Sequence, residues 1–120
     1  LNPDLLRWEL HRVWVAEATL KPGQNHVYSR RVFYVDEDSW AALLSDQYDA
    51  RGQLYRVGMA FMAPSYDVPA PWADPFLHYD LATGVYAING WPGPSGWMRH
   101  VPCPSENEWS PDALAGAGVR

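Results

Sequence analysis

The sequence contains little cysteine and no long apolar run, and its few basic residues are scattered. The single cysteine, Cys103, cannot form an internal disulfide and has no partners at metal-ligand spacing, which excludes a disulfide framework and a zinc site. No stretch approaches the roughly 18 apolar residues of a membrane-spanning helix. Nine basic against fourteen acidic side chains give a formal charge of −5, which argues against a nucleic-acid surface.

A signal peptide is also missing from the first residues, LNPDLLRW, which have neither a basic start nor an apolar stretch. We therefore expect either a cytoplasmic protein or a mature or trimmed part of an exported one. At 120 residues the chain has the size of one modest domain. Aromatic residues and proline are abundant instead, with seven Trp, seven Tyr and eleven Pro, and this composition favours a β-rich domain with rigid loops.

Strand-like runs and turn signals alternate along residues 1–90, and they predict an antiparallel meander of about six strands. The predicted strands are 8–20, 26–36, 40–49, 53–63, 76–81 and 85–89. The first strand changes phase near His11 and Arg12, which predicts a β-bulge there. Ser39 could instead cap a short helix over the run WAALL, but strand is favoured because a hairpin signal follows within ten residues.

Turn chemistry explains how the predicted strands are joined. Residues 21–24, KPGQ, form a type II turn signal, and residues 49–52, DARG, predict a type I turn whose glycine makes a bulge. Residues 64–75 hold four prolines, so they are predicted to be an ordered loop or an extended edge segment. Residues 91–120 form a Gly/Pro/Trp-rich tail, part of which we expect to pack on the sheet through Trp91, Trp97 and Trp109.

No catalytic or metal-binding constellation is apparent. The four histidines share no ligand spacing, although His11 and His26 could face each other across the first hairpin as a two-ligand site. Asp36, Glu37 and Asp38 are best interpreted as a solvated turn, because a calcium loop needs more oxygen ligands and a glycine. We therefore predict a protein without enzymatic activity, metal or cofactor.

The surplus of aromatic side chains is the feature with functional weight. Strands two to four are apolar on both faces, and a chain this small cannot bury two full layers by itself. The second apolar face therefore predicts a cover, a partner or an apolar ligand. The candidate ligand-binding residues on this face are Trp14, Phe33, Val35, Trp40, Tyr55, Val57, Met59 and Phe61.

Several stretches resemble one family. RWELHRVWVAEATLKPGQNHVYSRRVFYVDEDSW and DQYDARGQLYRV, followed by YDVPAPW and YDLATGVY, look like the C-terminal part of a Gram-negative family of unknown function. That family is grouped with outer-membrane lipoprotein-sorting proteins. The likeness runs from about Asn2 to Tyr86, and the closing SPDALAGAGVR resembles the end of the family. The resemblance covers only the last third or so of longer, exported proteins.

The resemblance implies a strongly curved antiparallel sheet, or half-barrel, like that of the periplasmic lipoprotein carriers, with a concave apolar face covered by helices. No catalytic residue carries over. The leading hypothesis is a periplasmic or outer-membrane-associated module that binds a lipid, a lipoprotein or another hydrophobic molecule. An outer-membrane protein or a transporter is an expected partner. The alternative is an interaction module that pairs, or self-associates, through its aromatic face or its sheet edges.

Overall fold

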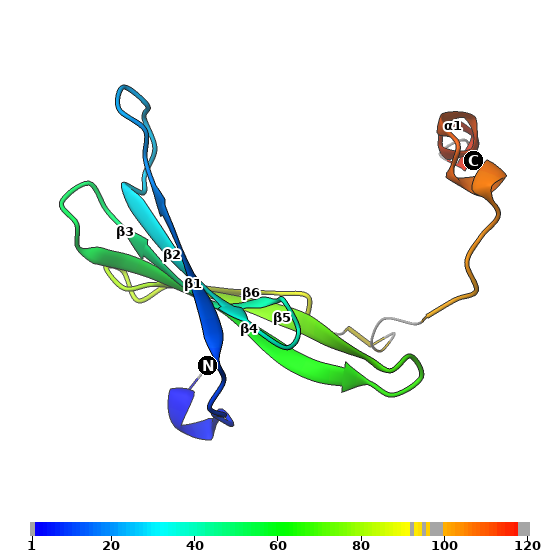
Figure 1. Cartoon of the computed structure of the whole chain (residues 1–120), viewed down its shortest axis with the longest axis horizontal. Coiled ribbons are helices and arrows are strands. Elements are labelled where there is room, and N and C mark those ends of the chain that lie inside the picture. Colours follow the sequence, from blue (N-terminus) through cyan, green and yellow to red (C-terminus); the bar gives the residue numbers. More distant parts are fainter. Residues whose placement is uncertain (1, 92, 95, 97–99, 118–120) are drawn as a thin grey trace.

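The computed structural model describes residues 2–91, 93, 94, 96 and 100–117. A short 3₁₀ helix, η1, begins the described chain, and six strands follow it before a second 3₁₀ helix and one short α-helix (Figure 1). The elements are η1 Pro3–Leu5, β1 Val13–Thr19, β2 Arg30–Asp36, β3 Ala42–Tyr48, β4 Leu54–Ser65, β5 Ala70–Asp80, β6 Tyr86–Asn89, η2 Glu106–Trp109 and α1 Pro111–Ala117.

The six strands form one twisted antiparallel sheet in the order β1-β2-β3-β4-β5-β6. Each strand pairs with its neighbours in sequence, and β1 and β6 lie at opposite edges, so the sheet is open. The predicted mainly β meander of six antiparallel strands is confirmed. The strand assignment of residues 42–48 is confirmed as well, since Ala42–Tyr48 pairs with both β2 and β4 instead of forming a helix.

Three predicted strands begin later than expected, and the fifth begins earlier. The second starts at Arg30 and not at His26, so His26 and Tyr28 lie in the loop before it. The fifth starts at Ala70 and not at Phe76, because it also pairs with the end of β4. The first starts at Val13, so His11 and Arg12 precede it and the bulge predicted there is wrong. The third starts at Ala42, because Trp40 lies in the preceding turn with a left-handed φ of 59°. The Trp40 amide donates to the carbonyl oxygen of Asp36 at 2.9 Å, a contact that closes the turn. The extended sequence pattern thus begins before the paired strand in all three cases.

The turn that joins β3 and β4 has the predicted form. The Gly52 amide donates to the Asp49 carbonyl at 3.0 Å, and the Asp49 amide donates to the Gln53 carbonyl at 2.9 Å. Gly52 is the extra, left-handed residue at φ 75°, a conformation that costs a residue with a side chain more than it costs glycine. The Asp49 carboxylate also accepts from the Arg51 and Gln53 amides, which explains why aspartate begins this turn.

The proline-rich segment lies at an edge of the sheet, as predicted. Within the part of the chain that the structure describes, Ala70–Ala73 of β5 pairs with β4 alone, whereas β6 pairs with Phe76–Tyr79 further along the same strand. Among the described residues, Pro71 therefore lies where one side of β5 has no neighbouring strand, and its missing N–H interrupts no second ladder there. The twelve-residue β4 extends beyond β3 to pair with this segment.

Pairing register assigns the strand side chains to two faces, since directly opposed residues lie on the same side. We call the face that carries Val13, Tyr34, Leu44, Met59 and Leu77 the groove face. The opposite face carries Trp14, Phe33, Val35, Ser45, Gly58 and His78. Each face therefore receives side chains from every central strand.

The sheet has no complete second layer within the described residues. Val32 and Leu77 are the buried apolar side chains there, while twenty large apolar side chains are exposed. The chain exposes 9817 Å², against about 6,600 Å² for a compact monomer of this mass. Its radius of gyration is 18.5 Å, against about 14 Å for a compact chain of this length. Stable domains bury a sheet face against another layer, so both faces here are available for one.

Within the tail, residues 100–117 extend away from the sheet, and η2 packs against α1 there (Figure 1). His100 Nε2 lies 2.7 Å from the Ser65 hydroxyl, which links the tail to the end of β4. Trp91 and Trp109 are exposed, and Trp97 lies outside the described residues. Packing of the tail on the sheet therefore stays a prediction. Among the described residues, no helix has the length and apolarity needed to cross a bilayer.

Candidate functional site

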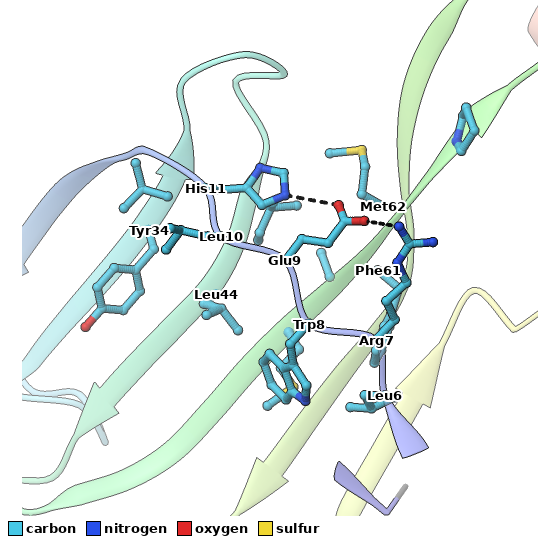
Figure 2. Close-up of a pocket in the computed structure, with 15 residues that line it drawn as sticks. Leu6, Arg7, Trp8, Glu9, Leu10, His11, Tyr34, Leu44, Phe61 and Met62 are labelled. Carbon is cyan, nitrogen blue, oxygen red and sulfur yellow. Dashed lines mark ion pairs between the residues drawn. The ribbon is translucent and has the colours of Figure 1, made fainter. Parts of the chain in front are cut away.

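A groove of about 670 Å³ lies on the groove face, beneath the segment that leads from η1 to β1 (Figure 2). We call this segment, Leu6–His11, the strap. It crosses the sheet in extended form and encloses the groove from one side. The groove is lined by Leu6, Arg7, Trp8, Glu9, Leu10, His11, Val13, Tyr34, Leu43, Leu44, Met59, Ala60, Phe61, Met62 and Pro64.

The floor of the groove follows from strand register. Tyr34 pairs with Leu44, and Leu44 pairs with Met59, so side chains from β2, β3 and β4 lie side by side. The Tyr34 hydroxyl donates to an Asp46 carboxylate oxygen at 2.9 Å, which raises the pKa of Tyr34. Because this bond holds the hydroxyl, the ring contributes apolar surface to the groove. The floor is therefore hydrophobic across three adjacent strands.

The strap alternates apolar and polar side chains along its length. Arg7, Glu9 and His11 form a row of ion pairs, with Arg7 Nη2 2.7 Å and His11 Nε2 3.5 Å from the Glu9 carboxylate. The intervening Trp8 and Leu10 are 59% and 102% exposed, although both line the groove. The strap thus covers the groove while Trp8 and Leu10 stay exposed and Leu6 is half-buried.

A buried carboxylate anchors the strap to the sheet. Asp36, at the end of β2, is 3% exposed, and its Oδ1 lies 2.9 Å from His11 Nδ1. Its Oδ2 accepts from the Ser39 amide at 2.9 Å and from the Ser39 hydroxyl at 2.5 Å. The Glu37 amide also donates to the Arg12 carbonyl at 3.1 Å. The prediction that residues 36–38 form a solvated turn is therefore wrong for Asp36.

Both partners of this anchor have shifted pKa values. The hydrogen bond to Asp36 is the largest cause of the raised pKa of His11, with Glu9 adding to it. The Ser39 hydroxyl is the largest cause of the lowered pKa of Asp36, and His11 adds to it. Each shift favours the charged form. The imidazolium and carboxylate forms therefore stabilise each other, and the contact ties the base of the strap to the turn after β2.

The predicted ligand-binding residues are divided between the two faces. Met59 and Phe61 line the groove, and Val57 lies on the groove face outside its lining. Trp14, Phe33 and Val35 lie on the opposite face. A ligand-binding role for these six residues stays a prediction, but the register shows that they do not form one surface.

The other two predicted ligand-binding residues, Trp40 and Tyr55, lie in a turn and at a β-bulge. Trp40 is in the β2–β3 turn and is 74% exposed. Tyr55 is an extra residue in β4, because Gln47 pairs with Arg56 and Tyr48 pairs with Leu54. The Tyr55 hydroxyl accepts from Arg56 Nη2 at 3.1 Å, so this bulge turns its ring toward the opposite face, where Arg56 lies.

Sequence reasoning missed the strap and part of the floor. The sequence pattern predicts a strand from Trp8 onward, whereas the alternation of Leu6, Trp8 and Leu10 with charged residues indicates an extended amphipathic segment. Tyr34 and Leu44 were missed because register decides which face each of them takes. The proposed pairing of His11 with His26 is wrong, since His11 contacts Asp36 whereas His26 contacts Arg31 at the other end of the hairpin.

Chemically, the groove offers apolar surface and a charged rim. Within the described residues, its lining contains no Ser, Thr or Cys that could act as a nucleophile. The same residues contain no group of three or more His, Cys, Asp or Glu side chains that could hold a metal ion. The geometry therefore suits a hydrophobic molecule with few directional contacts.

Comparison with known proteins places this sheet in a family. The sequence profile of a family described as "Protein of unknown function (DUF1329)" matches residues 1–115. The chain belongs to the DUF1329 family. An uncharacterized protein of Pseudomonas aeruginosa is 44% identical over 121 residues, which cover 100% of this chain. The predicted membership of a family of unknown function is confirmed.

Two solved structures share the fold of this DUF1329 chain. One is a provisionally named outer-membrane lipoprotein-sorting protein domain from Vibrio parahaemolyticus, with a TM-score of 0.55 and 20% identity. The other is a DUF1329 family protein from Desulfovibrio piger, with a TM-score of 0.54 and 21% identity. Each match covers 85% of this chain. The predicted likeness to lipoprotein-sorting proteins is thereby confirmed for the fold.

The chain spans only part of these proteins. It covers 27% of the length of the Pseudomonas protein. It also covers 41% and 40% of the two solved chains. The open sheet and its exposed faces thus correspond to a minor part of each longer relative.

Proposed function

We propose that this part of the DUF1329 protein is a non-enzymatic carrier module of the cell envelope, and that it binds a lipid, a lipoprotein or another hydrophobic molecule in the groove. The observation that carries the proposal is the groove itself: three strands form its apolar floor, and the strap that crosses it is anchored to the sheet by the contact of His11 with Asp36. The fold that it shares with a lipoprotein-sorting domain supports the same conclusion. A periplasmic or outer-membrane-associated location is part of the proposal.

Binding in this groove rests on the burial of apolar surface. Removing about 300 Å² of ligand surface from water contributes roughly 7 kcal/mol before the cost of association. The charged rim of Arg7, Glu9 and His11 is already internally paired, so it orients a ligand more than it holds one. A hydrophobic ligand with a small polar end fits this division. An outer-membrane protein or a transporter is the partner that we propose for delivery or acceptance.

The test uses the full-length, delipidated protein and a fluorescent fatty acid. Leu44→Asn places an amide in the groove floor, whereas Val35→Asn places the same amide on the opposite face of the neighbouring strand. We expect Leu44→Asn to weaken binding at least about tenfold, because an unpaired polar group is costly in an apolar site. Val35→Asn should change it less than about threefold. Equal effects, or no uptake by the unmodified protein, would contradict the carrier proposal.

A second candidate function is an interaction module, and the opposite face favours it. Trp14 is 57% exposed, and Phe76, which pairs with Ala60 on that face, is 43% exposed; among the described residues one edge of β1 is unpaired. Exposed aromatic side chains and free edges suit pairing with another chain. Light scattering of the full-length protein separates the two candidates. A monomer that takes up fatty acid supports the carrier, and a stable dimer that takes up none supports the interaction module.

A further inference from the structure

Three cationic or ionisable side chains contact one tyrosine at the end of the β1–β2 hairpin opposite the strap anchor. Tyr28 lies just before β2, in the blue loop between β1 and β2 (Figure 1). Its ring centroid is 5.2 Å from that of His26, 4.7 Å from the Arg31 guanidinium carbon and 5.9 Å from that of Arg56. The cluster lies outside the groove, whose lining contains none of these residues.

The two arginines of the cluster differ in how their charge is compensated. Arg56 donates from Nε and Nη2 to one Asp80 carboxylate oxygen, at 3.2 Å in both cases, and from Nη1 to the Tyr28 hydroxyl at 2.9 Å. Arg31 contacts the Tyr28 ring and His26, and no carboxylate of the described residues forms an ion pair with it. Arg31 therefore leaves an uncompensated positive charge at this end of the sheet.

The contacts of His26 cannot both be ordinary hydrogen bonds. The Tyr28 amide donates to His26 Nδ1 at 3.0 Å, so Nδ1 is the acceptor nitrogen. A neutral imidazole has only one acceptor nitrogen, so its Nε2 carries the proton. That Nε2 lies 3.1 Å from Arg31 Nη2, which also carries only protons. Two donors thus face each other, and neither has an acceptor in this contact.

We propose that His26 and Arg31 form a binding site for the oxyanion of a phosphate group. An oxygen atom placed beside the two nitrogens, which at 3.1 Å are too close to hold one between them, accepts from both donors and compensates the charge of Arg31. The Tyr28 ring beneath Arg31 fixes the guanidinium plane, and the Arg56–Asp80 pair fixes the Tyr28 hydroxyl. Free phosphate and the phosphate of an anionic lipid headgroup share this chemistry.

The experiment titrates inorganic phosphate into the full-length protein at constant ionic strength and follows the side-chain nitrogen resonances of His26 and Arg31 by NMR. We expect saturable shifts at both residues, together with a proton on His26 Nε2. Arg31→Gln should raise the dissociation constant at least about tenfold, because it removes a charged donor. The matched control is Arg51→Gln, since Arg51 lies in the exposed β3–β4 turn beside Asp49. This control should leave the constant within about twofold.

Flotation with phosphatidylglycerol vesicles identifies the source of the phosphate. Binding that is lost in Arg31→Gln assigns the site to a lipid headgroup, whereas phosphate shifts without flotation assign it to a free phosphate. If Arg31→Gln does not fold, His26→Phe in the exposed loop removes the second donor and should weaken phosphate binding in the same way. The proposal is overturned if phosphate causes no saturable shift in the unmodified protein. Equal binding by the folded variants would overturn it as well.

Discussion

The buried carboxylate of Asp36 makes the sharpest prediction about stability. Asp36→Ala removes the acceptor of three hydrogen bonds, two from Ser39 and one from His11. Each hydrogen bond to a charged acceptor contributes about 1.5 to 3 kcal/mol, and the contributions of one cluster are not additive. Since the freed Ser39 hydroxyl can turn to water, we expect a loss of about 3 kcal/mol in the free energy of unfolding.

The measurement is urea denaturation of the full-length protein, followed by circular dichroism and tryptophan fluorescence. Asp38→Ala is the matched control, because Asp38 lies in the same turn and is exposed. Exposed substitutions of this kind change the free energy of unfolding by less than about 0.5 kcal/mol. Asp36→Asn keeps one carbonyl oxygen and should lie between the two. If Asp36→Ala and Asp38→Ala destabilise the protein equally, the anchor does not hold the turn and the reasoning fails.

Two further predictions concern the pH dependence of stability and the close contact between Gly90 and the Asp74 side chain. Below pH 6.5 the raised pKa of His11 stabilises the fold, and this contribution disappears as the pH rises through the folded-state value. Above pH 3.8 the lowered pKa of Asp36 stabilises it, and this contribution disappears as the pH falls through the folded-state value. Melts across pH 3 to 8 should therefore show the two contributions together to be largest between those limits. In His11→Gln the loss at rising pH should be absent, whereas the loss at falling pH should remain because Ser39 still donates to Asp36. Gly90→Ala should lower the free energy of unfolding by about 2 kcal/mol, since its Cβ would lie 1.7 Å from Asp74 Oδ1. Gly23→Ala, which has the same left-handed backbone but open space around it, should lower it by about 1 kcal/mol. Equal urea midpoints for the two glycine variants would contradict this.

The sequence predicted the meander well because turn chemistry is local. Asp49 and Gly52 determine the β3–β4 turn by their own hydrogen bonds and φ, so no tertiary information was needed. Strand starts were harder, because the alternation of residues 8–12 is that of a strand but lacks a pairing partner in the described chain. An extended pattern indicates a conformation, and only a neighbour with free hydrogen-bonding groups makes it a strand.

The candidate site could be predicted only in part for the same reason. Met59 and Phe61 were placed on a ligand-binding face, and they line the groove. Phe33 and Val35 were assigned to the same face, but the pairing of Phe33 with Ser45 places them on the other one. When both the odd and the even positions of a strand are apolar, the sequence does not show which set faces the groove, so the register cannot be derived from it. The extra residue Tyr55 could not be located without the pairing.

The most direct test of the central claim locates a hydrophobic molecule on the protein itself. Stearate carrying a nitroxide label near its methyl end is added to the full-length protein, and methyl resonances are followed by NMR. The account predicts that the methyl groups of Met59 and Met62, which line the groove, broaden strongly. The methyl group of Ala16, which pairs with Phe33 on the opposite face, should stay sharp. Stronger broadening at Ala16 than at Met59, or no broadening at all, would contradict the claim that the groove binds hydrophobic molecules.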